Sequence, residues 1–404
     1  MVSKFCVLLG VFTLLVSAAV AAPVASSVVA QQRADTDLVD LSYNLTGAGA
    51  TGATIAVELS DDSGATYQVS APSLSGDLGS GIPDGTNKQI VWDAGVDRPD
   101  FVSETMRFRL IVSELQFPVP ADADKFALIP AGSFTMGDAL DGLLDAPQHA
   151  VSVSGFYMGK HEVSLSLWEE VRAWAVSNGY SDLSGVGSGR LYTHPVQNVS
   201  WYDVVKWCNA ASELANLEPV YYDSQGGAVF KAGTSTPYID YSKQGYRLPT
   251  EAEWEKAARG GLIGKRFAWG DTISHAEANY KTNRSGWSYD FSSHNSDDTY
   301  HPDYYEGTAP YTAQVGSFAA NGSGLYDMIG NVQEWCNDLY DGNYYNNSPS
   351  ADPAGPLSGS NRAQRGGSWD TGAYHCRVAY RSYGYPPSRN NGNGFRLVLS
   401  QIVP

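Results

Sequence analysis

The C-terminal third of this chain has almost no hydrophobic periodicity. Between Leu262 and Gln401 the sequence is rich in Gly, Asn, Asp, Ser and Tyr, and it follows neither the period of an amphipathic helix nor the alternation of a strand. The whole chain has 42 Gly, 25 Tyr and 10 Trp, and only 17% of its residues are charged. Large aromatic side chains and bound ions must therefore order the loops in place of regular elements, which predicts a loop-rich globule.

The few expected helices have clear boundaries. Thr250 can cap a helix that begins at Glu251, Glu253 completes a capping box, and Gly260-Gly261 ends the helix. Ser200 and Asp203 give a similar start to the helical segment 200–217. A third helix is expected over 164–178, where apolar side chains recur on one face.

Residues 35–115 predict a small all-β sandwich, loosely similar to immunoglobulin or fibronectin type III modules. Turn signals separate three segments in which apolar and polar residues alternate: Val39 to Leu45, Ile55 to Leu59 and Met106 to Val112. No set of residues here points to chemistry, so a spacer or adhesive module is expected.

A proline-containing segment separates this module from the rest of the chain. Residues 116–124 include Phe117-Pro118-Val119-Pro120, and proline fixes its own φ and extends its neighbour. This segment predicts a stiff linker, followed by a second domain at 125–404.

The N-terminus has the features of a secretory signal peptide. Lys4 precedes an apolar run from Phe5 to Val16, and small residues at positions 19–21 suggest cleavage after Ala21. This run is too short for a comfortable membrane span, and no later segment has the roughly 20 consecutive apolar residues that a span needs. We expect a soluble protein that is secreted, either periplasmic or extracellular.

The charge balance argues against nucleic acid as a partner. Asp and Glu number 43 against 26 Lys and Arg, giving a formal charge of −17. Such a surface repels phosphate backbones. The excess carboxylates could also bind a hard cation such as calcium, although a solvated acidic surface explains most of them.

Three cysteines remain once Cys6 leaves with the signal peptide, so at least one of them is unpaired within the chain. Cys208 lies on the apolar face of the helix expected over 200–217, which favours a buried thiol. Cys336 and Cys376 are the other two.

A series of motifs runs through the second domain in order from Ile129 to Arg396. They include IPAGSFTMG at 129–137, KHEV at 160–163, YRLPTEAEWEKAARGG at 246–261, GLYDMIGNVQEW at 324–335, RGGSW at 365–369 and GFR at 394–396. In these motifs the chain resembles the sulfatase-modifying-factor family, whose best-known member is the formylglycine-generating enzyme. The resemblance implies an α+β, C-type-lectin-like fold of low regular content.

The resemblance also implies two calcium sites. The family's first set of ligands matches Asp327, Gly330, Val332 and Glu334, and its second set matches Asn279, Tyr280, Asp303 and Tyr305. Both sets contain only oxygen ligands, and oxygen is what calcium prefers.

The catalytic residues of the family do not carry over. Its enzyme holds copper(I) between two cysteine thiolates and oxidises a sulfatase cysteine to formylglycine. Counting from Gly367-Ser368, these cysteines fall on Thr371 and Cys376. A threonine hydroxyl is a hard ligand, whereas copper(I) selects thiolate sulfur. Alignment backward from Arg377 and Arg381 makes the segment after Ser368 shorter than in the family, and Cys376 then no longer matches the second cysteine. Neither alignment keeps both catalytic cysteines.

Cys376 has three possible roles: a remnant thiol, a buried structural cysteine, or half of a disulfide with Cys336. The expected export favours the disulfide. Trp369 and Arg381 are expected beside the former site.

Two functions are compatible with these motifs. The first is a secreted, calcium-stabilised binding or scaffold protein with a degenerate catalytic site and an unknown protein or glycan ligand. Candidate contact residues are Tyr304-Tyr305, Tyr340, Tyr344-Tyr345 and Tyr383 to Tyr385, although most of these tyrosines could simply fill gaps between loops. The alternative is a formylglycine-generating oxidase that uses copper on a sulfatase peptide despite the altered cysteines.

Overall fold

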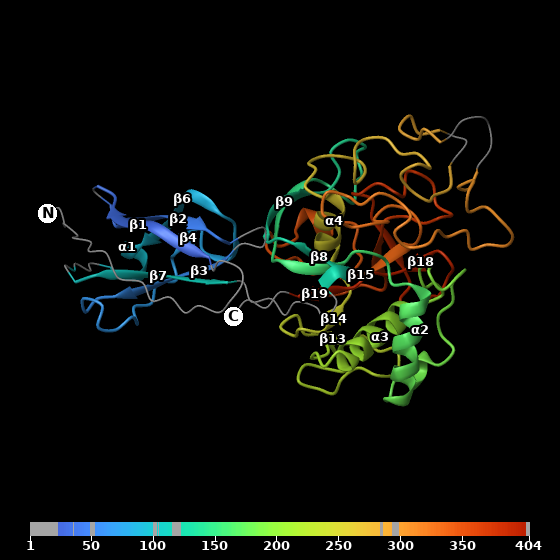
Figure 1. Cartoon of the computed structure of the whole chain (residues 1–404), viewed down its shortest axis with the longest axis horizontal. Coiled ribbons are helices and arrows are strands. Elements are labelled where there is room, and N and C mark those ends of the chain that lie inside the picture. The colour runs from blue at the N-terminus through green and yellow to red at the C-terminus, as the bar shows by residue number, and fades with distance from the viewer. Residues whose placement is uncertain are drawn as a thin grey trace. The chain divides into compact units, whose positions relative to one another are not determined.

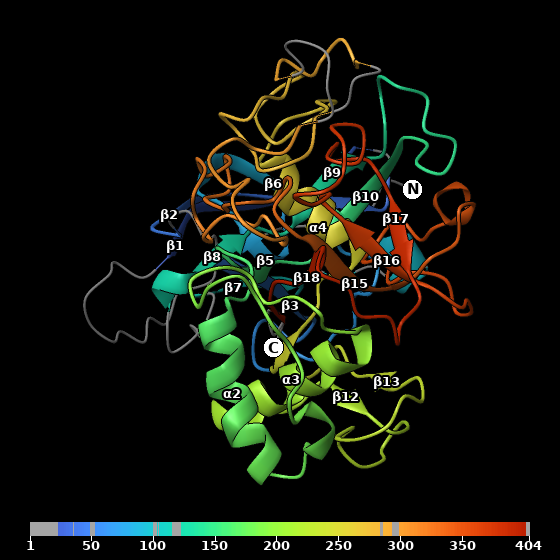
Figure 2. The same ribbon diagram turned by 90° about the vertical axis from the view of Figure 1, so that its right-hand side faces the viewer.

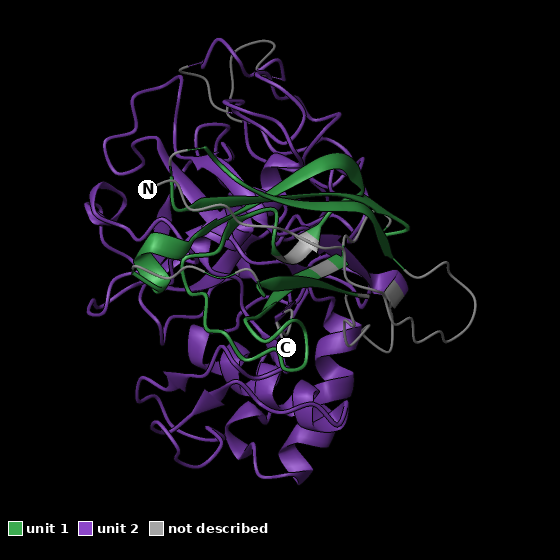
Figure 3. Cartoon of the chain, turned by 90° about the vertical axis from the view of Figure 1, so that its left-hand side faces the viewer, with its two compact units in different colours: residues 1–117, 403 green, residues 118–402, 404 purple. Residues whose placement is uncertain are grey.

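The chain forms two compact units, of residues 1–117 and 118–402 (Figures 1 and 3). The computed structural model describes residues 23–34, 36–48, 53–99, 103, 105–114, 123–282, 286–292 and 299–400. The expected signal peptide at 1–21 lies outside these residues, and so does most of the expected linker at 116–124. The division after Phe117 falls within that linker segment.

The first unit contains two sheets that share one core. Their strand orders are β1-β2-β6-β4 and β5-β3-β7. In β2 the alternation seen in the sequence places Val39, Leu41, Tyr43 and Leu45 in the core. The elements are β1 (Val24–Gln32), β2 (Leu38–Thr46), β3 (Ala53–Ser60), β4 (Ser75–Gly76), β5 (Gly79–Ile82), β6 (Gly85–Asp93), α1 (Ala94–Asp97) and β7 (Arg107–Glu114).

Strand β1 precedes residue 35, where the sequence placed the start of this module. It pairs antiparallel with β2, yet Ala25 is its only fully buried residue. A strand with so few core-facing residues carries no alternating apolar signal, and this explains why the sequence did not reveal it.

The second unit surrounds helix α4 with short strands and long loops (Figure 2). Its sheets have the orders β10-β9, β14-β19-β11-β8, β12-β13 and β17-β16-β15-β18. The strands are β8 (Phe126–Ile129), β9 (Gly132–Met136), β10 (His149–Val153), β11 (Phe156–Gly159), β12 (Tyr221–Tyr222), β13 (Tyr238–Ile239), β14 (Tyr246–Arg247), β15 (Gln333–Leu339), β16 (Arg362–Arg365), β17 (Ser382–Gly384), β18 (Asn393–Gly394) and β19 (Val398–Ser400). The α-helices are α2 (Leu165–Ser177), α3 (Trp201–Leu214) and α4 (Glu251–Arg259), with 3₁₀ turns at Ala123–Lys125, Ser181–Leu183 and Tyr344–Asn346.

All three expected helices are present with their expected caps. Ser164 accepts a hydrogen bond from the Leu167 N–H at the start of α2. Complete capping boxes begin the other two helices, at Ser200 for α3 and at Thr250 for α4. Gly260 ends α4 in the left-handed conformation, at a φ of 53°, which glycine adopts without a steric cost.

Aromatic pairs take the place of regular structure between α4 and β15. The described residues from 260 to 332 contain no helix or strand. They do contain stacked rings, among them Trp287 on Tyr289 and Tyr300 on Tyr305. The predicted α+β fold of low regular content is therefore confirmed.

Candidate functional site

Thr371 and Cys376 lie side by side beneath Gly367. A Cβ atom added to this glycine would lie 2.7 Å from Cys376 Sγ and 3.1 Å from Thr371 Oγ1. Gly367 has a φ of 73°, so the chain needs glycine here for its backbone conformation as well as for space. The structure thus brings together the two positions found by counting forward from Ser368, and the threonine occupies the first of them.

The chemical state of this pair is set by local hydrogen bonds and burial. Thr371 Oγ1 accepts a hydrogen bond from the Ser368 N–H at 2.7 Å and donates one to the Ser368 carbonyl at 3.1 Å. Burial raises the pKa of the Cys376 thiol to about 12, while the contact with Thr371 acts in the opposite direction. Cys376 is therefore a neutral thiol, and the Thr371 hydroxyl stabilises the turn from Ser368 to Thr371.

The predicted disulfide between Cys336 and Cys376 is wrong. Among the described residues Cys208, Cys336 and Cys376 are all free and buried. Cys376 faces Thr371, whereas Cys336 lies on β15, where Glu251 and Asp338 act on its thiol. Both thiols lie in the same hydrophobic core, and burial raises the pKa of each.

We expect the three thiols to resist alkylation in the native protein, because burial keeps them neutral and out of reach of the reagent. After denaturation without a reductant, all three should become labelled. Peptide mapping by mass spectrometry measures this directly. Recovery of a linked Cys336–Cys376 peptide pair from unreduced material would contradict the structure.

Trp369 lies close to Thr371, whereas Arg381 makes its contacts elsewhere. The Trp369 ring packs on Tyr300 and Tyr311, with centroid distances of 5.6 and 5.2 Å, and the Lys281 N–H donates to the Thr371 carbonyl. Arg381 instead forms an ion pair with Glu251 on α4, and thus the expectation that it lines this site is wrong.

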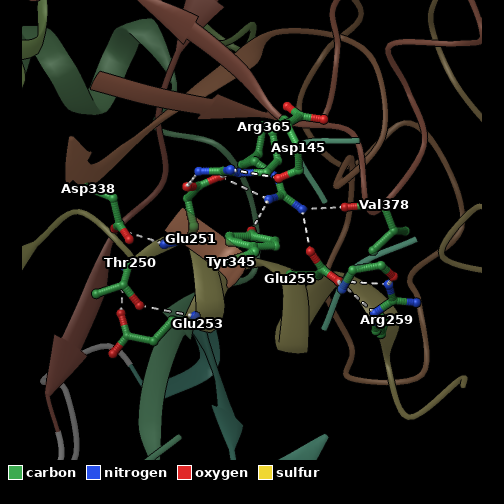
Figure 4. Close-up of polar contacts among 12 residues, drawn as sticks. Asp145, Thr250, Glu251, Glu253, Glu255, Arg259, Asp338, Tyr345, Arg365 and Val378 are labelled. Atoms are coloured by element: carbon green, nitrogen blue, oxygen red, sulfur yellow. Dashed lines mark hydrogen bonds and ion pairs between the residues drawn. The ribbon is translucent and has the colours of Figure 1, made fainter. Parts of the chain in front are cut away.

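Helix α4 is surrounded by a buried ionic cluster (Figure 4). Arg365, the first residue of the RGGSW motif, donates to Glu251 at 3.0 Å and to Glu255 at 2.7 Å. Arg381 completes the pairing of Glu251, and Arg259 that of Glu255. Burial alone would raise the pKa of both glutamates, but these arginines hold it below the usual range. The arginine of the motif therefore has a structural role.

The first predicted calcium set is only partly available. Glu334 accepts hydrogen bonds from Arg396 on both oxygens, at 2.8 Å each from Nε, and from the Trp254 indole at 2.7 Å. Asp327 accepts the Gly316 N–H on Oδ2, while its buried Oδ1 has no hydrogen-bond partner. Asp327 thus has a free buried oxygen that a cation could use, and Glu334 does not.

A third carboxylate, which sequence reasoning did not assign, joins this group. Glu162 is buried and accepts from Asn331 Nδ2 and from the Val332 N–H. Burial, together with Asp327 and Glu334, raises its pKa well above the ordinary value, and burial raises that of Asp327 to about 6. One guanidinium therefore faces three carboxylates. The KHEV motif at 160–163 was the available signal, but nothing in the sequence linked it to Asp327.

Tyr280 and Asp303 of the second predicted set lie around the pair His275 and His301. Asn279 is buried and its Oδ1 has no hydrogen-bond partner. The Tyr280 carbonyl, however, is 3.0 Å from His275 Nε2, and Asp303 and Tyr305 are exposed. In the described part of the chain, no three His, Cys, Asp or Glu side chains converge as a metal cluster. Any calcium here would depend on amide and carbonyl oxygens.

The candidate contact tyrosines fall into two groups. Tyr305, Tyr383 and Tyr385 are more than half exposed, whereas Tyr345 is buried against Arg365 and Arg381. Tyr304, Tyr340 and Tyr344 are intermediate. Three of the predicted tyrosines are thus on the surface. The helices of the described residues are all too short or too polar to cross a membrane.

Comparison with known proteins identifies the family. Residues 112–401 match the model of the sulfatase-modifying factor enzyme 1-like domain. The formylglycine-generating enzyme of Streptomyces coelicolor is 33% identical to this chain, over 66% of this chain and 87% of that enzyme. The enzyme of Mus musculus is 32% identical, over 70% of this chain and 77% of that enzyme. The solved structure of Treponema denticola variable protein 1 is similar, with a TM-score of 0.53 and 32% identity over 69% of this chain and 95% of that one. This chain belongs to the sulfatase-modifying-factor family.

Proposed function

We propose that this protein is an exported binding or scaffold member of its family, stabilised by calcium, and that it lacks formylglycine-generating oxidase activity. One observation carries this proposal: a threonine hydroxyl, bonded to its own loop, faces Cys376 where the family's enzyme requires a second thiol. Copper(I) bound linearly needs two soft donors, and a hydroxyl is not one. The remaining thiol is neutral at physiological pH, with a pKa near 12.

The oxidase test uses a cysteine-containing peptide from a sulfatase. Incubated with this protein, copper(I), oxygen and a thiol reductant, the peptide should keep its cysteine, as read by mass spectrometry. The formylglycine-generating enzyme of Streptomyces coelicolor serves as the positive control. Formylglycine formed by the unmodified protein would overturn the proposal and restore the oxidase alternative.

Thr371→Cys should create a copper(I) site, because position 371 already adjoins Cys376 Sγ beneath Gly367. In an anaerobic titration we expect stoichiometric copper(I) binding that Thr371→Cys/Cys376→Ala loses. Thr371→Ser is the matched control, since it keeps a hydroxyl at the same place and should not bind. Tight one-to-one binding by the unmodified protein that Cys376→Ala abolishes would contradict the proposal.

The buried carboxylates support calcium at the first predicted set. Asp327 Oδ1 would be the side-chain ligand, with the carbonyl oxygens of Gly330 and Val332. Glu334, held by Arg396, would add its charge nearby. When all three are ionised, the carboxylates Glu162, Asp327 and Glu334 exceed the single positive charge of Arg396 by two. The raised pKa of Glu162 and of Asp327 reflects this excess, and a divalent ion would neutralise it in place of protons.

Removal of calcium with a chelator should lower the midpoint of thermal unfolding of the second unit by about 5–10 °C, which corresponds to a ligand at about 100 times its Kd. Asp327→Asn should remove most of this shift. Asp303→Asn is the control for the second set. Because Asp303 is exposed, this substitution should leave the calcium-dependent shift unchanged. An unchanged midpoint on chelation would contradict calcium binding.

Export is proposed from the N-terminal sequence. Cleavage after Ala21 would leave β1, which begins at Val24, intact at the start of the mature chain. N-terminal sequencing of protein from the culture medium or the periplasm should begin at Ala22. A full-length chain found only inside the cell would contradict export.

A further inference from the structure

The two sheets of the first unit have the strand order of an immunoglobulin sandwich that lacks its last strand. A seven-stranded sandwich of that class has strands A, B, E and D in one sheet and C, F and G in the other. The order β1-β2-β6-β4 corresponds to the first sheet, and β3 and β7 correspond to C and F of the second. In the described residues no strand occupies the position of G, so the outer edge of β7 is open (Figure 1).

Strand β7 differs from the other sheet edges of this unit. Natural proteins protect their edges from pairing with other chains by short strands, bulges or charges. Strands β4 and β5 have only two and four residues, and β1 has a bulge between Ser26 and Val29. Strand β7 pairs with β3 over eight residues without a register shift. It is thus the long and regular edge in the described part of this unit.

The open edge leaves backbone groups without a strand partner. In an antiparallel pair, every second residue directs its N–H and C=O away from the neighbouring strand. Strand β1 comes close to β7, but it forms its ladder only with β2. Between Phe108 and Val112, the groups that point away from β3 therefore meet no other strand among the described residues. An added strand would satisfy them.

The side chains of β7 separate into two faces at this edge. Phe108, Leu110 and Val112 face the core of the sandwich, where Leu110 is buried and the other two are half-buried. Arg109 and Ile111 lie on the solvent face, because successive residues of a strand point to opposite sides. An added strand with apolar residues on the core side would cover the two half-buried side chains.

We propose that this edge pairs with the same edge of a second copy of the chain. The two β7 strands would run antiparallel about a two-fold axis, with Leu110 opposite the partner's Leu110. Phe108 then lies opposite the partner's Val112, and Val112 opposite the partner's Phe108. Cross-strand apolar pairs of this kind stabilise a sheet, and here they would cover the side chains that one copy leaves half-buried.

The side-chain pattern selects this register. A shift by one residue would bring the core face of one strand against the solvent face of the other. A shift by two residues would place Arg109 opposite the partner's Arg109, or Phe108 opposite the partner's Glu114. Only the register centred on Leu110 joins all three core-facing residues with one another.

The charge on the solvent face is compatible with this pairing. Arg109 donates from Nε to Glu58 of β3 at 2.9 Å, and its guanidinium lies 4.0 Å from the centre of the Tyr67 ring. Its charge is thus already paired within its own chain. In the proposed register Arg109 lies opposite the partner's Ile111, so no two like charges face one another between Phe108 and Val112.

This dimer goes beyond the proposed binding function and does not depend on it. Two copies joined through their first units would carry two second units, and a surface with repeated ligands would then be bound with avidity. The charge of −17 on each chain opposes association, and salt screens this repulsion. The dimer should therefore be tighter at high ionic strength than at low ionic strength.

The test is sedimentation velocity of the exported protein over a wide range of concentrations, with Ile111→Lys and Ile111→Glu as a matched pair. We expect a dimer that dissociates on dilution. Lysine would lie opposite the partner's Arg109 at two equivalent places and should raise the Kd of the dimer about tenfold, whereas glutamate should lower it several-fold. Net charge alone predicts the opposite order, because glutamate makes each chain more negative.

Three further measurements make the result specific. Val96→Lys adds the same charge at a valine of this unit that is 68% exposed and outside every strand, and it should leave the Kd unchanged. Circular dichroism and the thermal midpoint check that each variant is folded. In the unmodified protein, hydrogen exchange at 108–112 should slow as the dimer forms.

Three outcomes would overturn the proposal. The first is a protein that stays monomeric up to its solubility limit. The second is a dimer that both Ile111 variants weaken, since that excludes the register centred on Leu110, or one that Ile111→Lys leaves intact. The third is a dimer that forms without any change of exchange at 108–112, because its interface then lies elsewhere.

Discussion

Replacement of Arg365 by alanine should lower the free energy of unfolding of the second unit by about 3–5 kcal/mol. The side chain is fully buried and bridges Glu251 and Glu255, which are themselves at most 1% exposed. Its removal would leave two buried carboxylates short of one partner, since Arg381 and Arg259 pair only one glutamate each. Chemical denaturation monitored by tryptophan fluorescence measures the change.

The matched comparison is an exposed arginine pair. Arg33 contacts Asp40 at 2.6 Å, but their side chains are 46% and 30% exposed, so Arg33→Ala should have a much smaller effect on stability than Arg365→Ala. The loss of stability in Arg365→Lys should lie between those of Arg33→Ala and Arg365→Ala, because lysine keeps the charge and loses the planar guanidinium that reaches both glutamates. A cost below about 1 kcal/mol for Arg365→Ala would show that the cluster is not needed for stability.

Glu334→Ala should also lower the free energy of unfolding by about 3–5 kcal/mol. The loss should be nearly the same in calcium and in chelator. Its carboxylate neutralises the buried Arg396 and accepts the Trp254 indole N–H, so its removal leaves both without a partner. The sequence alone, which assigns Glu334 to the first calcium set, predicts instead that this substitution acts like removal of calcium. The ion pair with Arg396 changes that expectation.

A paired measurement distinguishes a role of Glu334 as a calcium ligand from its role as the ion-pair partner of Arg396. Asp327→Asn should lose stability only in calcium, whereas Glu334→Ala should lose it under both conditions. Glu334→Gln keeps the shape of the side chain and isolates the effect of its charge on Arg396. If the cost of Glu334→Ala disappears in chelator, Glu334 is a calcium ligand first and an ion-pair partner second.

The sequence by itself determined the features that depend on near neighbours. The capping boxes at Ser200 and Thr250 join residues three positions apart, and β2 follows from its alternating side chains. The ordered series of motifs gave the family and the fold class. The proposal that Thr371 replaces a catalytic cysteine also comes from the sequence, because the count from Ser368 is local.

Only the tertiary structure decided which distant side chains meet. The partner of Glu334 is Arg396, 62 residues away, and Arg381 binds Glu251, 130 residues away. The free, buried state of Cys336 and Cys376 could not be read from their spacing, because a disulfide requires the two Cα atoms to lie within about 7 Å of each other. Loops without periodicity carry no record of their partners, because burial and charge pairing across the core select those contacts.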